Sequence, residues 1–364
     1  MRGRHTQEDW RQCMKKTACR AIACSVGLTV MLVSCAIENE AVKIWGEDSI
    51  PPVFLSLEVD SSTQIRASFS APVSVLEASV LLNGPDGEEV RSSPAEWIPR
   101  EPGIPEQELC FTLEEFPSVG EKAIFSASVS DSSGNTLSMS VPFTGFNAKP
   151  AILRINEIRT AYSKPKVEFI EFVVLQGGNL GGIEVGNAAN TVRPVWEFPS
   201  SEVETGDYVV YHLRSVEDGL IDEVSAELVS PGTEARQDAR DFWDNQAKAP
   251  LKPTNVITVR ERKGGSLQDV LVCVAAGVEA WPTEALASAA AEACESGIWQ
   301  GGAQPAQAFC SAGMTATRTA GRNPDEQRSA DVEGWNDVSA GSWRICPTSK
   351  ASPGTVNAAW SDPS

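Results

Sequence analysis

AIFSASVSDSSGNTLSMSVPF, residues 123–143, contains two alternating segments separated by a turn-forming cluster. Successive side chains of a β-strand point to opposite faces, so every second residue shares a face. One face of the two segments is apolar and comprises Ala123, Phe125, Ala127, Val129, Leu137, Met139, Val141 and Phe143. Between them, Asp131, Gly134 and Asn135 suit a hairpin loop. The stretch therefore predicts an antiparallel hairpin that packs on one face.

The same period of two recurs through residues 51–148, where Ile65, Ala67 and Phe69 alternate with polar residues. About seven short strands in so short a segment predict a β-sandwich. Residues 62–74 (STQIRASFSAPVS) and 129–143 resemble the bacterial Ig-like domains of surface and envelope proteins. The turn at 131–135 offers too few oxygen ligands for calcium, which takes six to eight.

A second domain begins after FNAKPA, residues 146–151, and is expected to span residues 151–357. Four segments resemble, in order, the lamin tail domain, an Ig-type β-sandwich of nuclear lamins and many secreted bacterial proteins. They are ILRINEIRT (152–160), VEFIEFVV (167–174), VWEFPSSEVETGDYVVYHL (195–213) and SWRICPTSKASPGTVN (342–357). The fold class predicted for the whole chain is therefore all-β, with two Ig-like antiparallel β-sandwiches in tandem.

The lamin-tail resemblance rests on five short matches. These are the Asn-Glu strand at 155–158, the Glu-aromatic-Ile-Glu strand at 168–172, the glycine turn at 206–210, a late tryptophan (Trp335 or Trp343) and the closing Pro-Gly-x-x-Asn at 353–357. The chain departs from the family's pattern at one strand, where Gly182-Ile183-Glu184-Val185 stands in place of the usual Gly-Trp.

Two insertions interrupt the second domain, and both are predicted to be helical. Residues 233–246 have Thr233 as a candidate N-cap and Phe242-Trp243 as anchors, which predicts a short surface helix. Residues 282–296 begin with proline and are rich in alanine, which predicts the best helix in the chain.

The N-terminus resembles a secretory signal. Residues 21–34 carry no charge, follow Lys15, Lys16 and Arg20, and are too short for a membrane span of about 20 apolar residues. Leu32-Val33-Ser34-Cys35 resembles the lipobox of bacterial lipoproteins, which implies lipidation of Cys35 and cleavage before it. We expect a signal peptide over residues 1–35, with translation starting at Met14, a tether over residues 36–50, and a tail over residues 358–364. An ordinary signal peptide with an incidental cysteine is the alternative.

Charge and composition narrow the classes of partner. With 41% hydrophobic and 22% charged residues, the chain resembles a folded globular protein. Its net charge is −19, and removal of residues 1–35 would leave −23. Such a chain repels nucleic acid and anionic lipid headgroups, so we expect no nucleic-acid partner.

Five cysteines follow the expected anchor: Cys110, Cys273, Cys294, Cys310 and Cys346. In an oxidising compartment the last four are candidate disulfide partners with three alternative pairings, and Cys110 is the expected free thiol. No Cys-x-x-Cys occurs among them, and His212 is the only histidine after residue 35, so we expect no zinc site and no cofactor.

Residues suited to catalysis are few. His212 lies in a predicted strand and is expected to be a partly exposed structural histidine. Glu157, Glu168 and Glu171 could form an acid/base pair, but residues three apart on a strand face opposite sides. Residues 177–182, GGNLGG, lack the Lys-Ser/Thr of a phosphate loop and are predicted to connect strands. The second half is rich in tryptophan, which favours a packed core with one or two exposed rings at a binding patch.

We therefore expect a non-enzymatic envelope lipoprotein that acts as a binding, adhesion or scaffold module. It would be extracytoplasmic and lipid-anchored to a bacterial membrane, with a protein or extracellular-matrix partner presented to its loops. The rival prediction is a secreted hydrolase of nuclease or phosphodiesterase type, or an accessory domain of one, because lamin-tail-like domains accompany such enzymes. A solute receptor is a third alternative, but it would need two α/β lobes.

Overall fold

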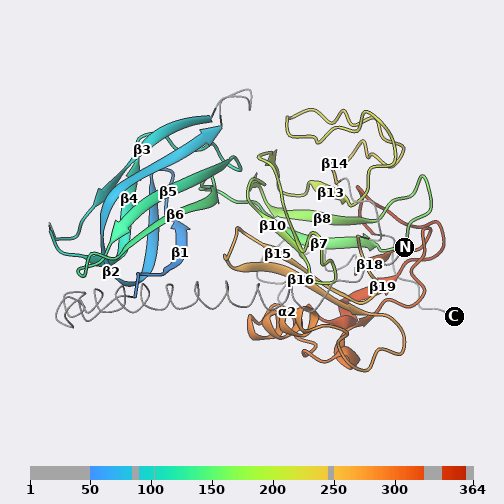
Figure 1. The fold of residues 1–364 in the computed structure, drawn as a ribbon. Helices are drawn as coiled ribbons and strands as arrows, with labels where there is room; N and C mark the ends of the chain where they lie inside the picture. The colour runs from blue at the N-terminus through green and yellow to red at the C-terminus, as the bar shows by residue number, and fades with distance from the viewer. Residues whose placement is uncertain (1–49, 84–89, 102, 245–249, 324–337, 358–364) are drawn as a thin grey trace, which may run out of the picture.

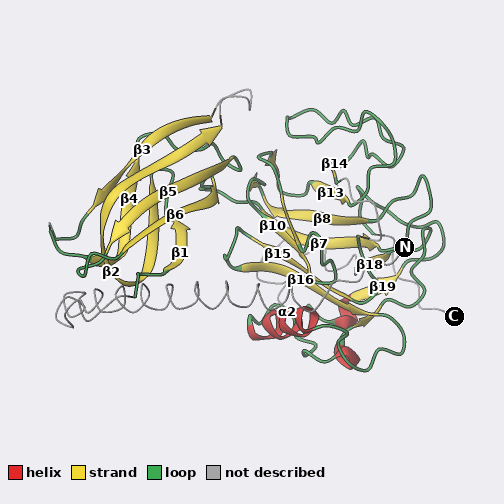
Figure 2. Ribbon diagram, in the orientation of Figure 1, coloured by secondary structure: helices red, strands yellow, loops and turns green. Residues whose placement is uncertain are grey.

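The computed structural model describes residues 50–83, 90–101, 103–244, 250–323 and 338–357. Cys35, Met14, Trp335 and the tail at 358–364 lie outside these ranges, so the structure describes neither the signal nor the anchor. The described chain forms two β-domains with separate cores (Figure 1). Strands dominate both, and the α-helix that the structure describes belongs to the second (Figure 2). None of the described helices is long and apolar enough to cross a membrane.

The first domain is an Ig-like sandwich of six strands: β1 (Phe54–Val59), β2 (Gln64–Asn83), β3 (Val90–Ile98), β4 (Glu106–Leu113), β5 (Lys122–Ser130) and β6 (Thr136–Thr144). β2 passes from one face of the sandwich to the other. Its first half pairs with β1 and β4, and its second half pairs with β3 and β5. The prediction of about seven short strands is wrong in this respect, because β2 runs for 20 residues. Register shifts between Ser68 and Val73 and between Val75 and Glu77 allow one strand to serve both sheets.

The hairpin predicted from residues 123–143 is confirmed. β5 and β6 pair in antiparallel register from Lys122↔Thr144 to Ser130↔Thr136. Asp131 accepts hydrogen bonds from the backbone N–H groups of Ser133 and Asn135, both at 2.9 Å, which fixes the turn. Gly134 has a φ of +84°, a conformation that glycine adopts at little cost. The predicted apolar face points inward, where Phe125 and Val129 are fully buried.

The second domain packs two larger sheets against each other. One sheet has the order β11-β10-β15-β16-β17 and the other has the order β14-β13-β8-β7-β18-β19. The strands of the second sheet are β7 (Ile152–Arg159), β8 (Phe169–Gln176), β13 (Tyr208–His212), β14 (Arg240–Trp243), β18 (Ala320–Arg322) and β19 (Trp343–Ile345). Those of the first are β10 (Glu184–Asn187), β11 (Val195–Glu197), β15 (Asn255–Arg260), β16 (Leu267–Val274) and β17 (Phe309–Cys310). A two-residue pair, β9 (Gly178–Asn179) with β12 (Glu202–Val203), lies outside both sheets. Of the two strands, β9 falls within residues 177–182, which were predicted to connect strands.

Two strand pairs in the second domain are parallel, although an antiparallel sandwich was predicted. β14 pairs in parallel with β13, and β17 pairs in parallel with β16. A parallel neighbour needs a long crossover connection. Residues 213–239 supply it in the first case, and a segment containing the helix α2 (Glu284–Glu295) supplies it in the second.

The helix predicted for residues 282–296 is confirmed as α2. Thr283 caps its N-terminus and accepts a hydrogen bond from Leu286 N at 3.3 Å. Leu286, Ala290 and Ala293 face the core of the second domain. Two short 3₁₀ turns, η2 (Pro305–Gln307) and η4 (Ala340–Ser342), complete the described helical structure.

The helix predicted for residues 233–246 is wrong, because residues 240–243 form the strand β14. The Thr233 hydroxyl donates to Glu217 Oε1 at 2.5 Å and so does not cap a helix. Phe242 is fully buried in the domain core, and its burial stabilises this segment as part of the sheet.

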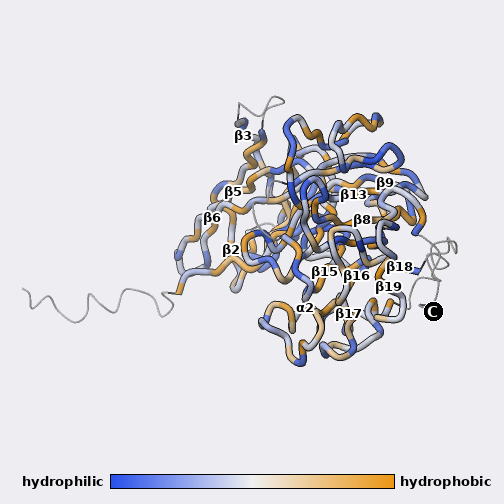
Figure 3. Tube along the Cα trace, turned by 90° about the vertical axis from the view of Figure 1, so that its right-hand side faces the viewer, coloured by the Kyte–Doolittle hydropathy of each residue, from blue (hydrophilic) through white to orange (hydrophobic). Residues whose placement is uncertain are grey.

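The two domains meet at the segment that connects β6 to β7. Asn147 Nδ2 donates to the carbonyl oxygens of Asn179 at 2.8 Å and Gly181 at 2.9 Å. Lys122 and Glu197 form an ion pair across the same junction at 3.4 Å. Figure 3 shows hydrophobic and hydrophilic residues distributed through both domains.

Candidate binding site

A long irregular loop, residues 213–239, joins the parallel strands β13 and β14. Figure 1 shows it standing above these strands, away from the first domain. Loops of more than about 15 residues without secondary structure are uncommon in compact domains and are usually functional. We call this segment the 213–239 loop.

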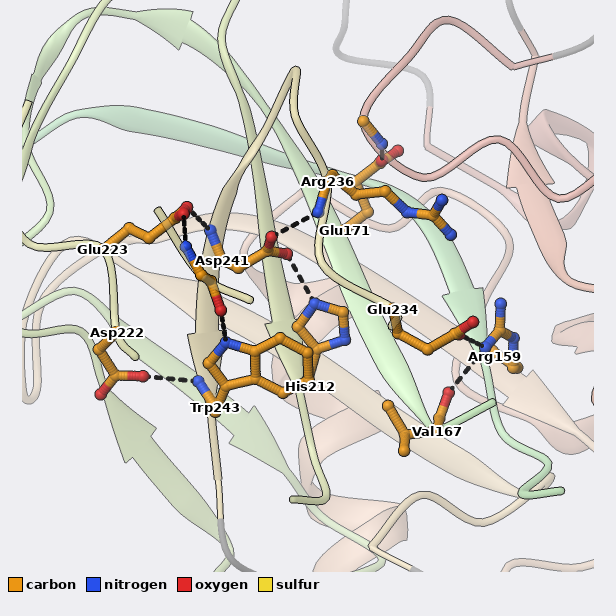
Figure 4. A network of polar contacts seen from close by, with 12 residues as sticks. Arg159, Val167, Glu171, His212, Asp222, Glu223, Glu234, Arg236, Asp241 and Trp243 are labelled. Carbon is orange, nitrogen blue, oxygen red and sulfur yellow. Dashed lines mark hydrogen bonds and ion pairs between the residues drawn. The ribbon is translucent and has the colours of Figure 1, made fainter. Parts of the chain in front are cut away.

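Acidic side chains of the 213–239 loop cover the outer edge of β14. Asp222 Oδ1 accepts from Trp243 N at 2.7 Å, and Glu223 Oε2 accepts from Asp241 N at 2.7 Å. The backbone N–H of Glu223 donates to Asp241 O at 3.1 Å. Figure 4 shows the two carboxylates aimed at these backbone groups. The outward N–H groups of an edge strand are thus satisfied by the loop rather than by another strand.

A buried pair, His212 and Asp241, lies under the same loop. His212 Nε2 and Asp241 Oδ1 are 2.6 Å apart, and Asp241 Oδ2 accepts from Arg236 N at 2.6 Å. The His212 ring stacks on Trp243 with centroids 3.9 Å apart. The prediction of a partly exposed histidine is wrong, because His212 is 1% exposed. The reason is that β13 is covered on this side by the 213–239 loop (Figure 4).

Two further contacts attach the ends of the 213–239 loop to the sheet. Arg214 forms a two-point ion pair with Glu168, with distances of 2.8 and 2.9 Å. Arg159, buried on β7, binds both the carbonyl oxygen of Val167 and the carboxylate of Glu234. Buried charge pairs with these extra hydrogen bonds hold a defined geometry. The loop is therefore irregular in shape yet attached at both ends and in the middle.

Beside the 213–239 loop lies a cleft of about 860 Å³. Its lining comprises Lys149, Gln176, Gly177, Gly178, Glu202, Val203, Glu204, Thr205, Asp207, Val224, Ser225, Ala226 and Arg240. Arg240 is 8% exposed, and its Nη1 binds the carbonyl oxygens of Glu223 and Ser225. The Nε of Arg240 is buried and has no hydrogen-bond partner among the described residues.

Four aliphatic side chains of the 213–239 loop are exposed: Ile221 (48%), Val224 (49%), Leu228 (41%) and Val229 (52%). Scattered exposed aliphatic residues are ordinary, but here four occur within nine residues of one loop, and we call these four the aliphatic patch. Val224 belongs both to this patch and to the lining of the cleft. We call the loop residues 221–229 together with the cleft the loop face.

The predicted acidic residues Glu157 and Glu171 are brought together by the register of β7 and β8, where they are directly opposite each other. Both side chains are buried. Burial raises the pKa of Glu157, and burial together with the charge of Glu157 raises the pKa of Glu171 well above its usual range.

The backbone N–H groups bound by this carboxylate pair come from the closing segment of the domain, and further partners come from the sheet. Glu157 accepts from Ser352 N at 3.0 Å and Ser352 Oγ at 3.1 Å, and from the Thr319 hydroxyl. Glu171 accepts from Asn156 Nδ2 at 2.6 Å and from Gly354 N. The carboxylates therefore hold the Pro-Gly segment against the sheet, which is a structural task.

Asn156 and Asn357 also hold the closing segment, residues 352–357, against the sheet. We call this set of contacts the closure of the second domain. Asn357 Nδ2 donates to Arg322 O at 2.8 Å and to Asn156 O at 3.1 Å. Both asparagines are buried. The Asn-Glu and Pro-Gly-x-x-Asn motifs, nearly 200 residues apart in sequence, are thus neighbours in space.

All five described cysteines are free thiols in this structure. Cys273 and Cys346 are buried, Cys294 and Cys110 are half-buried, and Cys310 is exposed. Burial raises the pKa of Cys273 to about 12, so this thiol is unreactive at neutral pH. Disulfides among Cys273, Cys294, Cys310 and Cys346 stay a prediction.

The tryptophans of the second domain serve mainly as packing groups. Trp299 and Trp343 are buried, and Trp196 stacks on Tyr211 with centroids 3.9 Å apart. Among the described residues no tryptophan is fully exposed. The exposed apolar side chains of the loop face are aliphatic, and sequence reasoning missed them because they follow no regular period.

Asp222, Glu223, Arg240 and Asp241 were also missed from the sequence. These residues join the 213–239 loop to the edge strand β14. Contacts of this kind produce no regular spacing of residues in the sequence. No group of three or more metal-ligating side chains occurs among the residues that the structure describes. The loop face is suited to contact another molecule through apolar and charged groups.

The fold and the loop face define a class: two Ig-like β-sandwiches in tandem, with an irregular, anchored loop at the end of the second. The chain belongs to the family described as TP_1001_2nd, protein second domain, whose model matches residues 151–341. It is 34% identical over 191 residues to an uncharacterized protein of Treponema pallidum (strain Nichols). That match covers 50% of this chain and 49% of the relative, so the chain spans about half the length of the curated relative.

Solved structures resemble the chain distantly. A DUF4876 family protein from Bacteroides thetaiotaomicron VPI-5482 is 12% identical, with a TM-score of 0.24, and the match covers 69% of this chain and 83% of that protein. The N-terminal part of the bacterial S-layer protein SbsC is 16% identical, with a TM-score of 0.24 and coverage of 44% and 42%.

Proposed function

We propose that the chain is a non-enzymatic binding or scaffold module of a bacterial cell envelope, tethered through lipidated Cys35, and that the loop face is its binding surface. The observation that carries this proposal is the 213–239 loop itself. Its residues Arg214, Glu223 and Arg236 are fixed by contacts with Glu168 and Asp241 of the sheet, while its aliphatic side chains are exposed. A rigid scaffold that presents a variable loop is the usual arrangement of binding modules.

A lamin-tail-like framework for the second domain is part of the proposal. Asn156, Glu157, Glu171, Gly354 and Asn357 come from the motifs that carry the resemblance, and they contact one another in the closure described above. Mutual contact of the motif residues supports a shared framework. In that framework these residues hold the domain closed.

The absence of catalysis is likewise a proposal. Glu157, Glu168, Glu171 and His212 are buried, and each is hydrogen-bonded to groups of the chain itself. A general acid or base must reach a proton on a substrate, so groups engaged in this way are poorly placed for the task. Full-length protein should show no turnover of phosphodiester, ester or glycoside substrates, with or without a chelator. Turnover that is lost in Glu168→Gln, with folding intact, would establish an enzyme instead.

A photo-crosslinking experiment tests the loop face as the binding surface. A photoreactive residue is placed at Val229 in the full-length protein in its native membrane, and the matched control carries it at Val192, which is 92% exposed on a different loop. We expect a discrete adduct from position 229 and none from position 192. Adducts of equal yield from both positions, or from position 192 alone, would show that binding does not use the loop face.

A further inference from the structure

We infer that the loop face binds an extended polypeptide segment that is both cationic and apolar. This inference rests on the function proposed above and adds the chemistry of the partner. The partner is defined by what would satisfy three features of the loop face: its negative charge, its aliphatic side chains and the buried guanidinium of Arg240.

The first feature is a surplus of exposed carboxylates. Six acidic residues of the loop face and its border are exposed: Glu202, Glu204, Asp207, Asp218, Asp222 and Glu227. Lys149 is the exposed cation among the residues that line the cleft. Opposite charges on two surfaces speed their encounter and select against like-charged partners. Lysine and arginine side chains on the partner would therefore match this rim.

The second feature is the aliphatic patch of the 213–239 loop. Ile221, Val224, Leu228 and Val229 expose between 41% and 52% of their surface. Burying such side chains stabilises a complex in proportion to the apolar area removed from water. A partner made only of charged groups would leave this area exposed. The partner must therefore carry apolar residues among its cations.

The third feature is Arg240, which lines the cleft next to Val224 and Ser225. The side chain is more than nine-tenths buried, and its Nη1 already binds two backbone carbonyl oxygens. Its Nε has no partner among the described residues, which is costly for a buried donor. That nitrogen is closed to solvent in this structure, so a bound chain would reach it only once the surrounding loop shifts. A backbone carbonyl oxygen would then be an acceptor of the same kind as the two that Nη1 already binds. This favours an extended segment, whose carbonyl groups are free, over a helix.

The test measures binding of labelled synthetic peptides to the full-length protein by fluorescence anisotropy. The probe is a 12-residue peptide that alternates lysine with leucine or valine. One comparison peptide replaces lysine with glutamate, and another replaces the apolar residues with serine. We expect the first peptide to bind most tightly and to bind more weakly at high salt, because screening weakens exposed charge pairs.

Substitutions in the protein test where the peptide binds. Val224→Ser with Leu228→Ser should weaken binding about tenfold, because about two apolar contacts are lost. Val192→Ser, on a different loop, is the matched control and should bind as the wild type does. Arg240→Lys keeps the charge and should bind the peptide less tightly if the planar guanidinium is needed. Circular dichroism of each variant checks that the sandwich is retained.

Three outcomes would overturn the inference. Tighter binding of the glutamate peptide, lost in the Val224/Leu228 variant, would keep the loop face as a binding surface and reverse the partner's charge. Equal binding of the lysine–serine peptide would show that the apolar patch takes no part. Binding that falls in Val192→Ser and not in the Val224/Leu228 variant would move the site elsewhere and would also contradict the proposed function.

Discussion

Among single residues, Glu157 and Glu171 bring two carboxyl groups together inside the second domain. They are paired across β7 and β8 in a buried environment that raises the pKa of both. Each carboxylate also receives backbone N–H groups from the closing segment, which partly offset the cost of burial. The two carboxyl groups hold that segment in place, and their burial lowers the stability of the folded domain at higher pH.

The raised pKa of Glu171 has a definite sign for stability. A carboxyl group whose pKa is higher in the folded protein than the ordinary 4.5 stabilises the fold most below that value. The contribution is lost as pH rises through the folded pKa. Glu157→Gln removes the neighbouring charge, and the Ser352 and Thr319 hydroxyls can accept from the new amide. We expect this variant to lose less free energy of unfolding than the wild type between pH 5 and pH 8.

The measurement is urea unfolding of the full-length protein at a series of pH values. Glu227→Gln, an exposed acidic residue, is the control and should follow the wild type. The comparison isolates the Glu157–Glu171 pair from other groups with raised pKa values, such as Glu184 and Asp222, since these are present in every variant. A pH dependence in Glu157→Gln equal to that of the wild type would contradict the assignment.

Asn357 is the second residue on which closure depends. Asn357→Ala removes the buried hydrogen bonds that Asn357 Nδ2 donates to Arg322 O and Asn156 O. We expect a loss of about 1–3 kcal/mol in the free energy of unfolding, measured by urea denaturation. Val356→Ala, a neighbour that is 48% exposed, should change it by less than about 0.5 kcal/mol. If the two variants lost the same amount, the hydrogen bonds of Asn357 would not be the cause.

At the scale of elements, the 213–239 loop and strand β14 stabilise each other. Glu223 accepts from Asp241 N at 2.7 Å and from Ser230 N at 2.8 Å, while its own side chain is buried. The loop therefore takes the position that an additional strand would occupy. This explains how a short parallel edge strand persists at the end of a six-stranded sheet.

Glu223→Ala should release the 213–239 loop while leaving both sandwiches folded. We expect faster protease cleavage within the loop and faster hydrogen exchange at the Asp241 amide, because local opening becomes easier when anchoring contacts are lost. Asp218→Ala, an exposed change in the same loop, is the matched control. Unchanged cleavage in Glu223→Ala would show that other contacts suffice to hold the loop.

Elements with a regular period could be predicted from the sequence, and those that depend on distant contacts could not. The β5–β6 hairpin follows from alternation and turn residues, and α2 follows from its cap and alanine content. The segment of β14 was predicted to be helical because four residues are too few to show a periodic pattern. Its place in the sheet depends on contacts with His212 and Glu223 and on the core around Phe242. The burial of His212 could not be foreseen for the same reason.

At the scale of the whole molecule, the proposed tether joins a strongly acidic body to a membrane. Cys35→Ser should move the protein from the membrane fraction to the soluble fraction after cell lysis, and a fatty-acid label should no longer be incorporated. Several acyl chains, at about 0.8 kcal/mol for each buried methylene, are needed for stable anchoring. Cys110→Ser, which changes a half-buried cysteine of the first domain, is the control. Retention of Cys35→Ser in the membrane fraction would exclude lipidation as the anchor.

The closure of the second domain also bears on how such a domain spreads among proteins. Asn156, five residues after the domain begins at residue 151, is in hydrogen-bond contact with Asn357 at its other end, so the chain enters and leaves at nearly the same place. A domain with adjacent ends can be inserted into a host chain, or exchanged between hosts, without separating the flanking parts. The asparagine contact that holds the sandwich closed would therefore also make this domain portable in evolution, while the 213–239 loop stays free to diverge.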